Sequence, residues 1–311
     1  MEETTCEKSV GSVPNEIVRK ETIAPGFKLM EIRAPDIAEK ISPGQFMILR
    51  VDEEGERIPM SVADWDREKG TVTLVFQELG LSTKKLGLVE VGQRLSNLAG
   101  PLGKPAEVGF FGTVVCVSGC FGTGPGYAFA RALKEAGNRV IYIAEALRGE
   151  LLFWLDRLEE VSDQLIITSG DKTVGVARWA KDPLREVLGS EQVDRIYLVG
   201  CTFMLMTCSR ASEPFGVETR VSLMPIMIDG TGMCGACRVN IDGEIKLACV
   251  EGPEFDGHQV DWDELMERAR GYLKEEERAL DLWEIDNWHH VRYRDREPEK
   301  RRKKRGGPRR C

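Results

Sequence analysis

The chain has 311 residues, of which 42% are apolar and 30% charged, and its formal net charge is −8. This length predicts two domains with enough apolar side chains for sizeable cores, and leaves room for a small third module. The acidic balance argues against general nucleic-acid binding.

The start of the chain and its cysteine content indicate the compartment. Residues 1–16 are acidic and polar, without the basic start and apolar run of a signal peptide. No stretch of the sequence approaches the roughly 20 apolar residues that a membrane span needs. We therefore expect a cytoplasmic protein with no membrane partner, whose nine cysteines are ligands or buried thiols rather than disulfides.

The first predicted domain follows an N-terminal extension, residues 1–14, and covers residues 15–107. It contains short β-rich segments separated by Pro, Gly and Asp: ETIAPGFKLMEIRAP, GQFMILRV, MSVADWD and TVTLVFQEL. Several short strands at this spacing predict a small antiparallel β-barrel.

The second predicted domain covers residues 108–222, where strands alternate with helices. The strand candidates are GTVVCVSG, NRVIYIAEA, DQLIITSGD and DRIYLVGC, and the helix candidates between them include GYAFARALKEAGN and ELLFWLDRLEEV. This alternation is typical of βαβ units around a parallel sheet.

The last third of the sequence divides into three predicted parts. Residues 223–260 are rich in glycine and cysteine and contain a short hairpin, and residues 261–290 are predicted to form one C-terminal helix. Residues 291–311 hold eleven Lys or Arg and three Asp or Glu, a local charge of +8 that leaves −16 for the rest. Such a tail has no apolar face, so we expect it to be flexible in the isolated chain. One role that its arginines could have is to pair with an acidic surface of a partner subunit.

The strongest motif for function is MIDGTGMCGACRVNIDGEIKLACVEGP. It places Asp229, Cys234, Cys237 and Cys249 at the Cys-x4-Cys-x2-Cys spacing of plant-type [2Fe–2S] ferredoxins, with Asp in the first ligand position. A carboxylate oxygen can bind iron where a thiolate would, and the surrounding glycines let backbone N–H groups reach the cluster. The alternatives are a zinc site, which usually recruits histidine and a second close pair, and three buried cysteines without metal.

Two segments of the first domain predict flavin binding. RIPMSVAD begins with Arg57, which can hold a pyrophosphate, and contains Ser61, which can hydrogen-bond the flavin ring. The segment from Phe76 to Leu86 places Gly80, Ser82 and Thr83 just before a predicted helix, an arrangement that can cradle phosphate. The alternative is a surface arginine on a strand that happens to contain one serine.

A glycine-rich turn between a strand and a helix predicts nucleotide binding. Gly119, Gly122, Gly124 and Gly126 would let a pyrophosphate approach the helix N-terminus closely. The alternative is a glycine-rich helix start without a ligand.

These three signals, in this order, resemble the ferredoxin–NADP+ reductase superfamily. The resemblance covers roughly residues 15–283 and is strongest to the small subunit of NADH-dependent ferredoxin:NADP+ oxidoreductase, sulfide dehydrogenase and the dihydroorotate dehydrogenase electron-transfer subunit. It implies an all-β flavin barrel, a nucleotide-binding α/β domain, a [2Fe–2S] hairpin module and a helical C-terminus. It also implies FAD and NAD(H) as cofactors, a role in electron bifurcation, and a larger flavin and iron–sulfur partner subunit.

The resemblance assigns cofactor contacts residue by residue. On the flavin side they are Arg57, Pro59, Met60, Ser61, Phe76, Gln77, Gly80, Ser82 and Thr83. On the nucleotide side they are Gly119, Gly122, Gly124, Pro125, Gly200, Cys201 and Thr202. The metal ligands are Asp229, Cys234, Cys237 and Cys249.

The expected function is an NAD(P)H-dependent oxidoreductase subunit in which hydride reaches FAD and single electrons leave through the cluster. No acid–base catalytic residue is expected. The nucleotide turn departs from the family pattern, because Phe121 adds bulk and Cys201 replaces a proline. These departures favour the alternative function, a non-catalytic relay or assembly subunit of a larger complex such as a hydrogenase, with a degenerate nucleotide site. Ferredoxin is a further possible partner.

Overall fold

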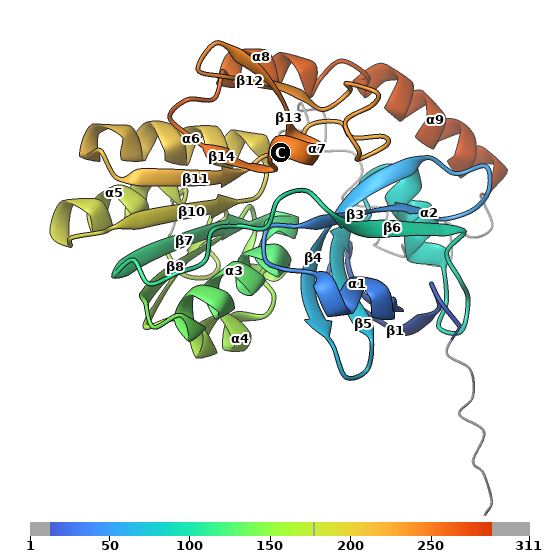
Figure 1. Ribbon diagram of the computed structural model, residues 1–311, viewed down its shortest axis with the longest axis horizontal. Helices are drawn as coiled ribbons and strands as arrows, with labels where there is room; N and C mark the ends of the chain where they lie inside the picture. Colours follow the sequence, from blue (N-terminus) through green and yellow to red (C-terminus); the bar gives the residue numbers. More distant parts are fainter. Residues whose placement is uncertain (1–12, 177, 288–311) are drawn as a thin grey trace, which may run out of the picture.

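The computed structural model describes residues 13–176 and 178–287. Two six-stranded sheets lie side by side, and a two-stranded sheet and the helices of the C-terminal part lie over them (Figure 1). The basic tail at residues 291–311 and nearly all of the N-terminal extension lie outside the described ranges, so the predictions made for them stay predictions.

The first sheet is antiparallel, with strand order β1-β2-β5-β4-β3-β6. Its strands are β1 (Ile17–Ala24), β2 (Phe27–Arg33), β3 (Phe46–Arg50), β4 (Arg57–Asp66), β5 (Thr71–Gln77) and β6 (Asn97–Leu102). Two short helices accompany it, α1 (Pro35–Lys40) and α2 (Leu81–Leu88).

Strand β3 is buried on both faces. Met47 and Leu49 point into the core of the antiparallel sheet, while Phe46 and Ile48 belong to the core that continues into the C-terminal part. Because side chains alternate along a strand, an unbroken apolar run such as FMIL fits a strand covered on both sides. The C-terminal part therefore packs directly on this sheet.

The second sheet has the order β14-β11-β10-β7-β8-β9, and only β14 is antiparallel to its neighbour. Its strands are β7 (Thr113–Gly119), β8 (Arg139–Ala146), β9 (Gln164–Ser169), β10 (Arg195–Val199), β11 (Glu218–Ser222) and β14 (Glu254–Asp256). The helices are α3 (Thr123–Glu135), α4 (Leu155–Glu160), α5 (Lys181–Ser190) and α6 (Thr202–Ser212), with single turns η1 (Cys120–Gly122), η2 (Gly149–Leu151) and η3 (Glu213–Phe215).

The parallel strands are apolar on both faces because helices cover both. In β7, Val114 and Cys116 pack in the core shared with α3 and α4, whereas Val115 and Val117 pack in the core shared with α5 and α6. Figure 1 shows the two helix pairs on opposite sides of this sheet. This is the layered arrangement expected of alternating strands and helices.

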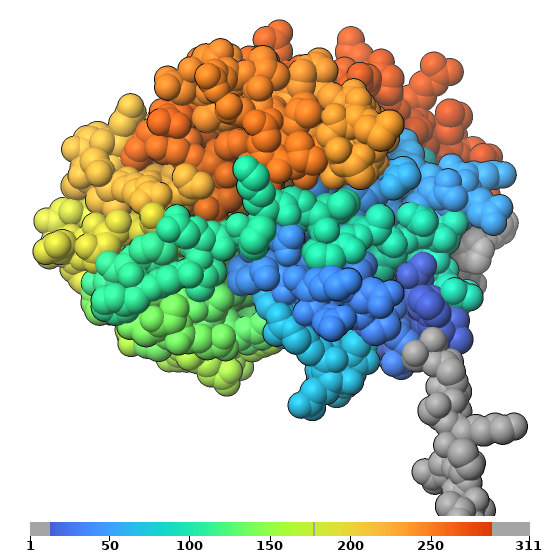
Figure 2. Space-filling model, viewed as in Figure 1, coloured from blue at the N-terminus to red at the C-terminus, as the bar shows by residue number. Residues whose placement is uncertain are grey.

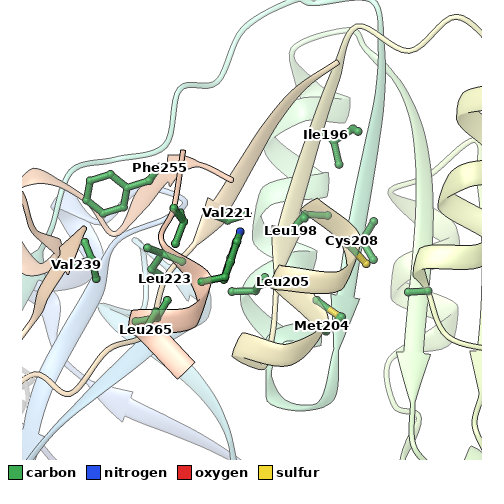
Figure 3. Close-up of a cluster of buried hydrophobic side chains, with 14 of the residues drawn as sticks. Ile196, Leu198, Met204, Leu205, Cys208, Val221, Leu223, Val239, Phe255 and Leu265 are labelled. Atoms are coloured by element: carbon green, nitrogen blue, oxygen red, sulfur yellow. The ribbon is translucent and has the colours of Figure 1, made fainter. Parts of the chain in front are cut away.

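The C-terminal part contains β12 (Arg238–Ile241), β13 (Glu244–Leu247), α7 (Ala248–Glu251), α8 (Trp262–Arg268) and α9 (Leu273–Asp286). Strand β14 lies inside the segment predicted as the iron–sulfur module, yet it pairs with β11 and so extends the parallel-rich sheet. Figure 3 shows Val239 and Leu265 of this part in one apolar cluster with Leu205 of α6. The module thus shares its core with the second sheet.

Residues 261–290 were expected to form one helix, but the chain forms two, α8 and α9. The N–H groups of Arg270 and Gly271 bond the carbonyls three residues back, at 3.0 and 3.1 Å, which tightens the end of α8. Helix α9 then packs beside α2, where Glu284 accepts a hydrogen bond from Lys84 at 2.8 Å. Within the described residues, none of the helices combines the length and apolar character needed to cross a membrane.

The two large sheets meet where α3 begins. A Cβ added to Gly124 would lie 2.9 Å from the Cβ of Ala63 on β4 and 3.0 Å from the Cβ of Val75 on β5. Only glycine therefore lets the first turn of α3 approach the antiparallel sheet this closely.

We predict that Gly124→Ala lowers the free energy of unfolding by about 1–2 kcal/mol, because overpacking outweighs the gain in helix propensity. The matched control is Gly189→Ala in α5, where an added Cβ meets nothing within 4 Å. That change should leave stability equal or raise it by up to about 1 kcal/mol. Chemical denaturation of both variants measures the difference, and equal effects would contradict the packing assignment.

Candidate functional site

The two predicted flavin segments lie together at one end of the antiparallel sheet. Arg57 is the exposed first residue of β4 and pairs in register with Arg50 of β3. Its neighbour Glu56 accepts a hydrogen bond of 2.8 Å from the Ser82 hydroxyl at the start of α2. The exposed guanidinium of Arg57 and the N-terminus of α2 thus belong to the same region of the surface.

The start of α2 leaves room for a ligand. Gly80 is the residue before the helix, and a Cβ added there would meet nothing within 4 Å. The backbone N–H groups of Leu79 and Gly80 both donate to the Thr83 hydroxyl at 3.1 Å, which fixes the shape of the turn. An open glycine before a helix N-terminus fits the close approach of a phosphate.

The remaining flavin-side residues are less accessible. Phe76 and Met60 lie in the apolar core of the sheet, and Phe76 is only 2% exposed. Pro59 and Gln77 are half-buried on β4 and β5. Core packing accounts for Phe76 and Met60, and their predicted cofactor contacts stay predictions.

The predicted cluster ligands are arranged as two pairs. The Cys234 thiol lies 3.5 Å from Asp229 Oδ1, and the Cys249 thiol is hydrogen-bonded to Cys237. Among the described residues, no three His, Cys, Asp or Glu are close enough to share one metal ion. A [2Fe–2S] cluster takes two protein ligands on each iron, so two pairs fit it better than a single zinc ion, which needs all its ligands together.

Backbone hydrogen bonds hold the carboxylate of Asp229. Thr231 donates its N–H to Oδ1 at 3.1 Å, and Met233 and Cys234 donate theirs to Oδ2 at 3.0 and 3.1 Å. These bonds, that of Thr231 first, lower the pKa of Asp229 below its ordinary value. The group therefore carries its negative charge near neutral pH, the form that binds iron.

Burial has the opposite effect on the other pair. Cys249 is 1% exposed, and burial, followed by the hydrogen bond with Cys237, raises the pKa of its thiol to about 12. Without metal this thiol stays protonated at neutral pH. Metal binding must therefore displace its proton, as it does at thiolate sites generally.

The loop that carries these ligands rests on the antiparallel sheet. A Cβ added to Gly230 would lie 2.7 Å from Leu102 of β6 and 3.0 Å from Ile48 of β3. At the start of the same segment, the Met224 sulfur lies 4.0 Å from the Ser61 hydroxyl of β4. In the space-filling view the orange C-terminal part lies against both the blue and the green parts of the chain (Figure 2). The cluster loop and the flavin strand are thus neighbours.

The two predicted nucleotide turns adjoin each other at the carboxyl edge of the parallel sheet. A Cβ on Gly200 would lie 3.1 Å from the carbonyl oxygen of Gly119, and one on Gly122 would lie 2.3 Å from that of Val199. Cys201 and Thr202 follow as the cap and first residue of α6. Close contact between the turns explains these glycines without a ligand.

The first turn of α3 is also buried against other protein atoms. Gly124 and Pro125 are buried, and Gly124 faces the antiparallel sheet. Phe121 packs against the apolar cluster of Ala24, Phe27, Ala63, Val75 and Phe153 between the sheets. Its ring therefore anchors the turn to the other half of the molecule. The nucleotide contacts of these residues stay predictions.

Three residues that shape the site were given no role by the sequence analysis. Met224 and Gly230 bring the cluster loop to the sheet, and Asp64 pairs with two arginines of the nucleotide half. Asp64 is the last residue of the predicted flavin motif RIPMSVAD, and this position was the only hint in the sequence that Asp64 contributes to the site. Nothing in the sequence around Met224 indicates its contact with Ser61.

Comparison with known proteins supports the cluster loop. Residues 225–261 match the family model described as the iron-sulfur cluster binding domain of dihydroorotate dehydrogenase B. The matched range contains all four predicted ligands. The prediction of an iron–sulfur module is therefore confirmed.

Relatives extend the similarity to most of the chain. A dihydroorotate dehydrogenase B (NAD(+)), electron transfer subunit homolog from Thermotoga maritima is 41% identical over 86% of this chain and 94% of its own length. The dihydroorotate dehydrogenase B (NAD(+)), electron transfer subunit of Desulforamulus reducens is 29% identical over 78% of this chain and 95% of its own.

A solved structure shares the whole fold. The structure of an NADH-dependent reduced ferredoxin-NADP oxidoreductase, reported for its insights into flavin-based electron bifurcation, is 40% identical and superposes with a TM-score of 0.84. The match covers 88% of this chain and 99% of the other. The predicted family and the mixed α/β fold of ferredoxin-reductase type, with one antiparallel and one parallel-rich sheet, are confirmed. The chain belongs to the family of dihydroorotate dehydrogenase B electron-transfer subunits.

Proposed function

We propose that this electron-transfer subunit binds FAD on its antiparallel, barrel-type sheet and a [2Fe–2S] cluster on its C-terminal loop, and passes electrons from NAD(P)H to a partner subunit. The observation that carries the proposal is the packing of the cluster loop on the sheet that holds the flavin residues, through Gly230 and Met224. Two redox centres held on one sheet can exchange electrons without further protein groups.

The flavin assignment is supported by the surface beside Arg57. Its guanidinium would pair with the FAD pyrophosphate, the N-terminus of α2 would face a phosphate across Gly80, and Ser61 would hydrogen-bond the flavin ring. When bound, FAD accepts a hydride and releases its electrons one at a time. The chain itself needs to bind, orient and space the cofactor.

The nicotinamide assignment is supported by where the two turns lie in the fold, and not by free space beside their glycines. The turns at Gly119 and Gly200 lie at the carboxyl edge of a parallel sheet, where α/β folds bind nucleotides. Other protein atoms fill the space beside these glycines. This favours the alternative function of a relay subunit with a degenerate nucleotide site.

The partner is proposed to be a larger subunit that carries its own flavin and iron–sulfur centres. The solved relative reported for flavin-based electron bifurcation supports a bifurcating complex of this kind. In the alternative function, the partner would be part of a hydrogenase or another redox complex. Cys234 is the exposed ligand of the four, so the cluster would be accessible from that side.

The first prediction concerns the cluster. Cys237→Ala should abolish it, reducing bound iron from the two per chain of a [2Fe–2S] cluster to none. Cys208→Ala is the matched control, because Cys208 is equally buried but lies in α6 outside the loop. Iron and sulfide analysis with electron paramagnetic resonance measures both variants. An intact cluster in Cys237→Ala rules the ligand set out, while Asp229→Cys should keep the cluster and shift its potential.

The second prediction concerns flavin. Arg57→Ala removes a charge-assisted contact worth about 1.5–3 kcal/mol, so FAD affinity should fall roughly 10- to 100-fold. Arg139→Ala is the control, since Arg139 is also the exposed first residue of a strand but pairs with Glu191 at the other sheet. Isothermal titration of FAD into the apo-chain gives both affinities. Equal affinities for the two variants would remove Arg57 from the flavin site.

The third prediction concerns the nicotinamide. Anaerobic titration of the FAD-loaded chain with NADH should bleach the flavin absorbance. NADPH is titrated in parallel, because the choice between the two nucleotides is open. Reduction by neither, together with no measurable binding of either, would exclude direct nucleotide oxidation and support the relay function.

A further inference from the structure

A stack of alternating arginine and aromatic side chains joins the two halves of the molecule. The Arg131 guanidinium lies 5.0 Å from the ring centre of Trp65 and 5.5 Å from that of Tyr127. The Arg157 guanidinium lies 4.1 Å from the ring centre of Tyr127 and 4.3 Å from that of Trp154. Trp65 belongs to β4, whereas the other four residues belong to α3 or to α4 and its start.

One carboxylate holds both arginines. Asp64 on β4 accepts a hydrogen bond from Arg131 at 2.6 Å through one oxygen and from Arg157 at 2.5 Å through the other. The Asp64 side chain is 19% exposed, so solvent screens this pairing less than it screens a surface ion pair. A register shift between Val62 and Asp64 interrupts the pairing of β4 with β5 at this point. Such a bulge re-aims side chains, here toward the helices.

The arginines depend on Asp64 for their arrangement. Two guanidinium groups this close to one tyrosine ring repel each other unless an anion lies close to both. A groove of about 670 Å³ borders this cluster, with Thr73 and Phe153 in its walls. On this side the halves are joined by the Asp64 pairs and the contact of Arg131 with Trp65, beside the apolar contact between the Phe27 and Phe153 rings.

Helix α3 contacts β4 both at its first turn and in its second half. Gly124 contacts Ala63 at the first turn, and Arg131 contacts Asp64 seven residues later, about 10 Å along the helix axis. The Asp64 pair therefore adds a charged contact in the second half of the helix to the apolar packing at its first turn. The same helix begins at the proposed nucleotide turn, and the same strand carries Ser61, three residues before Asp64.

We propose that Asp64 is a positioning residue that, through Arg131 and Arg157, fixes the proposed nucleotide turn relative to the flavin strand for hydride transfer. This inference rests on the proposed function for the hydride step it serves. Asp64 touches neither proposed cofactor site through its own side-chain bonds, which all go to the two arginines and to the N–H of Trp65.

The test is Asp64→Asn in the full FAD-loaded chain, which keeps the size of the side chain and removes its charge. The rate of flavin reduction at saturating NADH should fall roughly 10- to 100-fold, the cost of misplacing reactants by about 1 Å. FAD content, iron content and flavin reduction by dithionite should be unchanged. Asp64→Glu should recover part of the rate, and Arg157→Gln, which keeps the Arg131 pair, should give an intermediate rate.

Asp163→Asn is the matched control. Asp163 also pairs with a cation of α3, Lys134, at 2.6 Å, but this pair lies within the nucleotide half and does not cross to β4. Its variant should reduce flavin as fast as the wild type. Wild-type rates in Asp64→Asn, or an equal loss in Asp163→Asn, would overturn the proposal.

A second readout separates this inference from the proposed function. If NADH does not reduce flavin in the wild type, the proposed nicotinamide step is wrong, and hydrogen exchange then decides the role of the pairs. Amide exchange in β4 around Ala63 and in the first turn of α3 should be faster in Asp64→Asn than in Asp163→Asn. Equal exchange in both variants would show that Asp64 does not hold the two halves together.

Discussion

The close approach of glycine backbones to the antiparallel sheet is the constraint on which the rest of the structure depends. Gly124 brings α3 onto β4 and β5, and Gly230 brings the cluster loop onto β3 and β6. Both approaches leave less than 3 Å for a Cβ at the nearest atom, so a larger residue would push on the strands at Gly124 and would have to move the Leu102 side chain at Gly230. The sheet thereby becomes the common support for the nucleotide half and the cluster loop.

The burial of β3 on both faces has a direct functional consequence. One face completes the core beneath the proposed flavin site, and the other supports the loop that holds Asp229 and Cys234. A relative movement of flavin and cluster would require this doubly packed strand to move. Rigid spacing of this kind suits electron transfer, in which the protein contributes position and environment rather than acid–base groups.

The sequence was informative where spacing alone determines chemistry. Three cysteines and an aspartate at this spacing in a glycine-rich loop are typical of few kinds of site, and the family model confirms the iron–sulfur assignment. Alternation of strands and helices likewise predicted a parallel sheet, because each strand buried on both faces needs a helix on each side. The break between α8 and α9 was missed, since Gly271 stands inside an otherwise helical and charged segment.

Long-range contacts were harder to predict from the sequence. The glycines of the α3 turn fit a nucleotide motif, yet Gly122 and Gly124 are required by atoms of Val199, Ala63 and Val75, which lie far away in sequence. The contact between Met224 and Ser61 and the pairing of Asp64 with two arginines are of the same kind. A local pattern shows that a residue must be small or charged, but only the fold shows what it meets.

The central claim is that electrons reach the cluster through FAD held on the same sheet. The most direct measurement is the rate of cluster reduction by NADH, followed by rapid-freeze electron paramagnetic resonance in the FAD-loaded chain and in the same chain stripped of FAD. Cluster reduction should occur only when FAD is present and should follow bleaching of the flavin. A cluster that is reduced equally well without FAD, or that stays oxidised beside fully reduced flavin, would contradict the account.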